Sequence, residues 1–131
     1  MSTEAAAIPM PTHHCGTIGS GAMGAPTFHY NVLVNPITHE IHGFGSITQA
    51  VAPPHNMLHV NITSGRVNGL GIIPYSLLIT MQGTVSNPPS MLVSPFTAHM
   101  MVDMHWNGIG GFEYLGHHIE NVKAVSGPCL L

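Results

Sequence analysis

The stretch Phe96-Thr97-Ala98-His99-Met100-Met101-Val102-Asp103-Met104-His105-Trp106 alternates between two sets of side chains. Every second residue, counted from Phe96 to Trp106, is apolar, and most of the residues between them are polar. A period of two residues is typical of a β-strand with one buried face. The stretch therefore predicts a strand over residues 96–106, with Met100 and Met104 in the core and Met101 on the histidine-bearing face.

Other segments show the same alternation, and Pro- and Gly-rich turns separate them. No segment shows a convincing helical period, so seven to nine short strands indicate an all-β fold, either an antiparallel sandwich or a barrel. We expect a Gly/Pro-rich N-terminal arm over residues 1–26, one β domain over 27–126 and a tail over 127–131. The remaining predicted strands cover residues 28–34, 40–51, 57–63, 66–73, 75–82, 112–115 and 117–125.

Charged residues make up only 5% of the 131 residues, and the formal net charge is −3. Soluble domains usually carry about a quarter charged residues, so self-repulsion between copies is weak. Two basic residues cannot neutralise a phosphate backbone, which argues against a nucleic-acid partner. No apolar run reaches membrane-spanning length, and residues 1–7 lack the features of a signal peptide. We expect a cytoplasmic protein, or an extracellular-matrix protein if its role is structural.

Histidine replaces the usual charged residues: the chain holds eleven histidines. Imidazole titrates with an unperturbed pKa of about 6.5, so most are neutral near pH 7 and most are charged in mild acid. Protonation of all eleven would move the formal charge from −3 to about +8. Solubility and self-association should change sharply across this interval.

Two blocks of sequence resemble a known family. The segment Phe28-His29-Tyr30-Asn31-Val32-Leu33-Val34-Asn35 precedes the block Gly43-Phe44-Gly45-Ser46-Ile47-Thr48-Gln49-Ala50-Val51-Ala52-Pro53-Pro54. Both resemble a family of small uncharacterised proteobacterial proteins with a Gly-x-Gly-x-Ile-Thr-Gln-Ala-Val-x-Pro-Pro block. The resemblance is firmest over residues 28–54 and weakens toward residue 125. It implies an all-β domain of unknown function, and it implies no activity and no site.

Metal binding is one chemistry that the histidines could support. Neighbours on one face of a strand lie about 7 Å apart, so Asp103 and His105 could share an ion with ligands from an adjacent strand. Imidazole with thioether suits copper, and imidazole with carboxylate suits zinc. No HExxH or CxxC pair is present, so the alternative is that these residues are solvated surface groups. The candidate metal ligands are His99, Asp103, His105, His117 and His118.

Other reactive patterns carry less weight. The segment Gly19-Ser20-Gly21-Ala22-Met23-Gly24 matches a dinucleotide fingerprint, but no apolar strand precedes it and Pro26 prevents a helix from following it. Cys15 follows two histidines but has no visible catalytic partner, so we expect neither an enzyme nor a cofactor. Cys15 and Cys129 could pair within the chain, cross-link neighbouring chains or remain thiols.

The composition therefore predicts a non-enzymatic structural protein that self-assembles into a filament, lattice or matrix. Charge-poor sheets lack the lysine and glutamate that protect natural strand edges from pairing with each other. Exposed imidazoles could also bind a mineral such as silica, because a ring near its pKa both donates and accepts protons. The alternatives are a His/Met-rich module that binds copper or zinc, and a β-barrel that holds a small ligand in a large apolar cavity.

Overall fold

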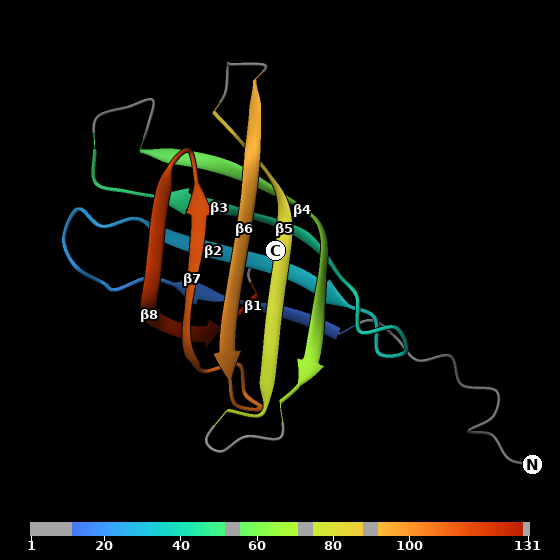
Figure 1. Ribbon diagram of the computed structural model, residues 1–131. Coiled ribbons are helices and arrows are strands. Elements are labelled where there is room, and N and C mark those ends of the chain that lie inside the picture. Colours follow the sequence, from blue (N-terminus) through green and yellow to red (C-terminus); the bar gives the residue numbers. More distant parts are fainter. Residues whose placement is uncertain (1–11, 52–55, 71–74, 88–91, 130–131) are drawn as a thin grey trace, which may run out of the picture.

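The computed structural model describes residues 12–51, 56–70, 75–87 and 92–129, which form a closed antiparallel barrel (Figure 1). Each strand pairs with its neighbours in sequence, and β1 pairs with β8 to close the barrel. The all-β antiparallel prediction is confirmed, and the architecture is a barrel rather than a sandwich. The described strands are β1 (Thr12–Ile18), β2 (Thr27–Val34), β3 (Ile41–Thr48), β4 (Met57–Gly69), β5 (Leu77–Ser86), β6 (Val93–Val102), β7 (Gly108–Tyr114) and β8 (His117–Gly127).

Aromatic rings fill the inside of the barrel. Phe28 on β2 lies with its ring centroid 4.7 Å from that of Phe96 on β6 and 5.9 Å from that of Phe112 on β7. Tyr30 lies two residues further along β2, and its ring centroid is 5.9 Å from that of Trp106. Rings offset or tilted at such distances attract each other in addition to removing apolar surface from water. They belong to one cluster of buried side chains, so the described interior is packed core and not the large cavity that a ligand-binding barrel needs.

Inward-facing glycines make room for these rings. A Cβ on Gly45 of β3 would lie 2.3 Å from the His29 carbonyl oxygen and 2.8 Å from Cε1 of Phe28. A Cβ on Gly16 of β1 would lie 2.5 Å from the hydroxyl oxygen of Tyr30. All three separations are shorter than van der Waals contact. The barrel therefore pairs a large residue on β2 with a glycine on each neighbouring strand.

The strand predicted over residues 96–106 ends early. β6 stops at Val102, and a tight turn follows in which Asp103 Oδ1 accepts hydrogen bonds from the backbone N–H groups of His105 and Asn107. Trp106 adopts the left-handed region with φ of 67° and returns its ring to the core. The turn breaks the alternation, so the prediction for Met100 is confirmed, whereas Met104 is 69% exposed and its predicted place in the core is wrong.

The predicted boundaries also need correction. Residues 12–18 of the predicted arm are strand β1 and complete the barrel, while residues 1–11 lie outside the described residues. The strands predicted over 57–63 and 66–73 are one strand, β4, with an irregularity between Ile62 and Ser64, and residues 71–73 lie outside the description. Gly127 of the predicted tail is the last residue of β8 and pairs with Cys15.

The closing seam between β1 and β8 is the shortest ladder in the barrel. It has four residue pairs, from Cys15–Gly127 to Ile18–Ala124, whereas the other ladders have six to ten. A disulfide between Cys15 and Cys129 spans this seam and links residues 114 apart in sequence. Of the three possibilities for the cysteines, the structure shows pairing within the chain. The described residues include no helix able to cross a membrane.

Candidate functional site

The structure brings together two of the five predicted metal ligands. His99 on β6 and His118 on β8 both contact Glu120, at 3.2 Å from His99 Nε2 and 2.9 Å from His118 Nε2. Nδ1 of His118 also lies 3.6 Å from Glu113 of β7. The hydrogen bond from His118, followed by the charge and hydrogen bond of His99, lowers the pKa of the Glu120 carboxyl. We call these four residues, which lie on the outside of the barrel, the β6–β8 cluster.

The other three predicted ligands lie elsewhere. Asp103 uses its carboxylate to hold the β6–β7 turn, and the hydrogen bonds from the backbone of Asn107 and His105 lower its pKa. The ring of His117 packs against Tyr114, with the centroids 5.1 Å apart. The sequence did not identify Glu113 and Glu120 as partners, because their approach depends on the pairing of β6, β7 and β8. The five predicted residues therefore do not form one site.

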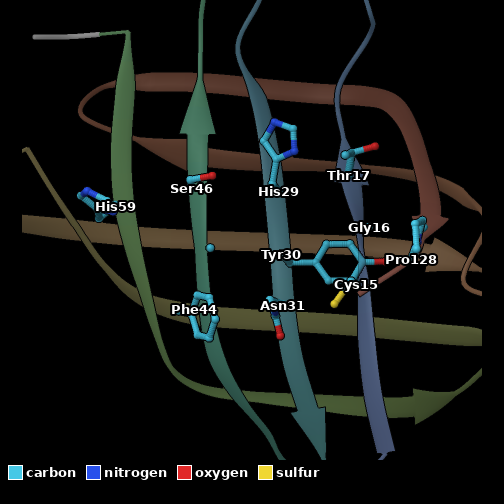
Figure 2. Close-up of a pocket in the computed structure, with 12 residues that line it drawn as sticks. Cys15, Gly16, Thr17, His29, Tyr30, Asn31, Phe44, Ser46, His59 and Pro128 are labelled. Carbon is cyan, nitrogen blue, oxygen red and sulfur yellow. The ribbon is translucent and has the colours of Figure 1, made fainter. Parts of the chain in front are cut away.

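A second histidine-bearing surface covers the outside of β1 to β4, and we call it the β1–β4 face. The pairing register places outward side chains in lateral rows across the four strands (Figure 2). These rows surround a surface hollow of about 510 Å³, with Pro128 on the β8 side. One row is Thr17, His29, Ser46 and His59, and the next is Cys15, Asn31 and Phe44.

The histidines of the β1–β4 face have polar neighbours but no carboxylate partner among the described residues. His29 Nε2 lies 2.9 Å from the Thr48 hydroxyl oxygen, and burial lowers the pKa of His29. Among the residues that the structure describes, no Asp, Glu, Lys or Arg lines the hollow of this face, and Glu40 and Arg66 line a different hollow together with His42. This surface is therefore nearly free of formal charge at neutral pH, and acid makes it cationic.

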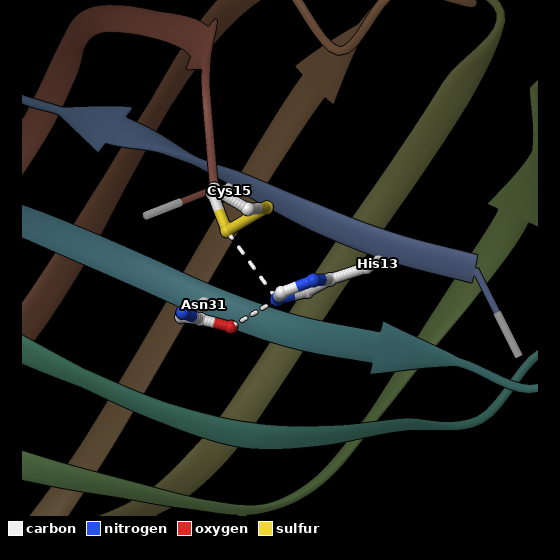
Figure 3. Close-up of a disulfide and its surroundings, with 4 residues drawn as sticks. His13, Cys15 and Asn31 are labelled. Carbon is white, nitrogen blue, oxygen red and sulfur yellow. Dashed lines mark hydrogen bonds between the residues drawn. A yellow bond between two sulfur atoms is a disulfide. The ribbon is translucent and has the colours of Figure 1, made fainter. Parts of the chain in front are cut away.

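The disulfide forms one corner of the β1–β4 face (Figure 3). His13 Nε2 lies 3.6 Å from Cys15 Sγ and is hydrogen-bonded to Asn31 Oδ1. The ligating atoms of His13, Cys15 and Cys129 all lie within 4.8 Å of one another. This group is not recognisable in the sequence, because Cys129 comes from the other end of the chain. Only the spacing of His13 and Cys15 in the sequence indicates part of this group, because two residues that are two positions apart lie on the same face of a strand.

His14 points the opposite way, as the alternation of β1 requires. Its ring stacks on Trp106, with centroids 4.0 Å apart and planes inclined by 3°. Burial, with a smaller contribution from the positive charge of His13, lowers the pKa of His14. The two adjacent histidines therefore have different surroundings: one lies at the disulfide and the other closes the core.

A family model for a domain of unknown function, DUF1842, matches residues 13–118. The chain belongs to this family. The DUF1842 match runs from His13 in β1 to His118 in β8, so it includes most of the barrel and the histidines of both surfaces, but not Glu120 or Cys129. No curated protein matches the chain significantly. The predicted likeness to an uncharacterised family is confirmed at this level, while the Gly-x-Gly block as its hallmark and its proteobacterial distribution stay predictions.

Proposed function

We propose that this DUF1842 domain is a non-enzymatic structural protein that self-associates through the outer surface of its barrel. The exposed side chains carry this proposal. Among the described residues, twelve large apolar ones are exposed, whereas only six are charged. Apolar surface favours association, and the small net charge of −3 gives copies little reason to repel each other.

The closed barrel changes how such association would occur. Unprotected sheet edges, which the low charge of the sequence suggested, do not occur here, because the described strands form a closed barrel without an edge strand. Copies of the domain therefore associate through faces, by packing side chains, rather than by extending a common sheet.

The β1–β4 face is the surface best suited to a second copy. Phe44 is 61% exposed and stands at the rim of the hollow of about 510 Å³. In a two-fold contact the same patch meets itself, so the Phe44 ring of each copy can enter the hollow of the other. Neutral imidazoles and hydroxyls around the hollow can hydrogen-bond across the contact without the cost of burying ions.

Acidification should cause two copies that associate through this face to dissociate. Protonation adds positive charge to both copies, and no carboxylate among the described residues pairs with the imidazoles involved. Glu40 lines a hollow with His42, but it lies beside Arg66, so it offers little compensation. The histidines on this face are His13, His29, His42 and His59.

Sedimentation and light scattering between about pH 5 and pH 8 test the proposal. We expect oligomers or larger particles near neutral pH that dissociate on acidification. Phe44→Ser should weaken association, whereas Met104→Ser, which removes an equally exposed apolar side chain from the β6–β7 turn, should not. A monodisperse monomer at every pH would refute self-association. Equal effects of the two substitutions would refute the assignment to the β1–β4 face.

Metal binding by the β6–β8 cluster is the second candidate. It is favoured by the position of Glu120 between two imidazoles, with a second carboxylate on His118. Calorimetric titration of the oxidised chain with Zn²⁺ and Cu²⁺ tests it, since Glu120→Gln should remove binding that depends on this cluster. Tight stoichiometric binding would favour a metal-binding role over a structural one.

A further inference from the structure

We propose that reduction of the Cys15–Cys129 disulfide creates a metal site in which both thiolates and the imidazole of His13 bind one zinc ion. This site is separate from the β6–β8 cluster and does not depend on self-association. It would make metal binding conditional on the redox state of the chain, because the same sulfur atoms are either bonded to each other or free to bind zinc.

The geometry of the oxidised corner already fits two of the three ligands. Zinc binds thiolate sulfur at about 2.3 Å and imidazole nitrogen at about 2.0–2.1 Å, so the two atoms stand about 3.6 Å apart in a tetrahedral site. The structure places His13 Nε2 and Cys15 Sγ 3.6 Å apart. No movement of β1 is needed to bring this pair to the separation that zinc requires.

The third ligand needs a small displacement. Two thiolates on one tetrahedral zinc stand about 3.8 Å apart, so Cys129 Sγ must withdraw from Cys15 Sγ once their bond is broken. Cys129 lies two residues beyond Gly127, the last residue of β8 and the last to pair with β1. No strand ladder therefore holds Cys129 in place, and its side chain can move while Cys15 stays fixed.

Asn31 orients the imidazole from the neighbouring strand. Its side-chain oxygen is hydrogen-bonded to His13 Nε2, which keeps this nitrogen turned toward the sulfurs (Figure 3). Zinc binding at Nε2 requires the tautomer with its proton on Nδ1, so the metal replaces the proton that Nε2 donates to Asn31 Oδ1, and this hydrogen bond is lost. His13 is exposed, which leaves a fourth coordination position open to water.

The reaction balances with a dithiol as the reductant. The dithiol gives two electrons and two protons to the disulfide, becomes a disulfide itself, and leaves thiols at Cys15 and Cys129. Zinc then displaces one proton from each thiol to the solvent. Two thiolates and Zn²⁺ together carry no net charge, so the loaded centre keeps the β1–β4 face neutral. Reoxidation by a small-molecule disulfide, which takes up two electrons and two protons and becomes a dithiol, would re-form the Cys15–Cys129 bond and release the ion.

Binding of Co²⁺ and Zn²⁺ to the full chain tests the site, with the chain oxidised or reduced by a phosphine that is then removed. We expect the reduced chain to bind one Co²⁺ with a near-ultraviolet thiolate-to-cobalt absorption band, which Zn²⁺ abolishes by displacement. The oxidised chain should show no such band. His13→Ala should weaken binding by roughly tenfold or more, whereas His42→Ala, which changes an exposed histidine on β3 that β2 separates from β1, should not.

Circular dichroism of the same samples covers the case in which the reduced chain unfolds. Recovery of the β-spectrum on addition of Zn²⁺, lost in His13→Ala and kept in His42→Ala, would support the site. Failure of Zn²⁺ to restore the fold would overturn it. A cobalt spectrum without a thiolate band, or equal binding by both histidine variants, would also overturn it.

Discussion

Removing the disulfide should lower the stability of the barrel by an amount that follows from its position. The bond links residues 114 apart, so nearly the whole chain lies within the loop that it closes. Closing a loop of on the order of 100 residues lowers the entropy of the unfolded chain enough to stabilise the fold by about 4.7 kcal/mol. For 131 residues the entropy of unfolding is roughly 0.28 kcal/mol/K, so the melting temperature should fall by about 17 °C.

The double variant Cys15→Ser/Cys129→Ser measures this effect without free thiols. Urea and thermal unfolding followed by circular dichroism give the change in free energy, and the reduced wild-type chain in a metal chelator should match the variant. Hydrogen exchange locates the effect: backbone amides of the four pairs between β1 and β8 should lose the most protection, because this ladder is the shortest. If the free energy of unfolding falls by less than about 1 kcal/mol, or if amide protection falls equally throughout the barrel, the disulfide does not stabilise the β1–β8 seam.

Three other perturbations test separate parts of the structure. Burial lowers the pKa of His14, so the unfolded chain binds a proton at this residue more tightly than the folded chain does. The free energy of unfolding should therefore fall as the pH drops below about 6.5. His14→Phe, which keeps the stack on Trp106, should make this dependence of the free energy on pH weaker in urea titrations. Gly45→Ala should cost about 1–3 kcal/mol in unfolding experiments because its Cβ would collide with β2, whereas Gly69→Ala, whose Cβ meets nothing within 4 Å, should be close to neutral. Assemblies should accelerate the condensation of silicic acid near neutral pH if their imidazoles engage silanols; unchanged kinetics, measured by molybdate assay, would count against a mineral-binding role.

The strands that the sequence revealed are those that carry their own core residues. On β2, Phe28, Tyr30, Val32 and Val34 alternate with more exposed residues, and all four are buried. On β4, Leu58, Val60 and Ile62 do the same. In such segments the apolar period is present in the local sequence, so no knowledge of the neighbouring strand is needed.

Strand β1 was missed because its neighbours supply the core volume that it lacks. Its inward positions are His14, Gly16 and Ile18, and only the last is an apolar side chain of ordinary core size. The ring of Tyr30 on β2 fills the space next to Gly16, and Trp106 covers His14. Hydrophobic periodicity could not identify this strand, because the pattern that buries it is shared among three segments of the chain.

The site around the disulfide could not be predicted from the sequence, because it too depends on contacts between distant segments of the chain. His13 and Cys129 stand near opposite ends of the chain, and only closure of the barrel brings them together. The β1–β8 seam thus controls the shape of the domain, the pairing of the cysteines and the approach of the imidazole to sulfur. Reduction should therefore loosen the seam and free the zinc ligands in one event, and zinc should restore part of the lost protection at β1 and β8. Protection that returns elsewhere, but not along this seam, would separate the metal site from barrel closure.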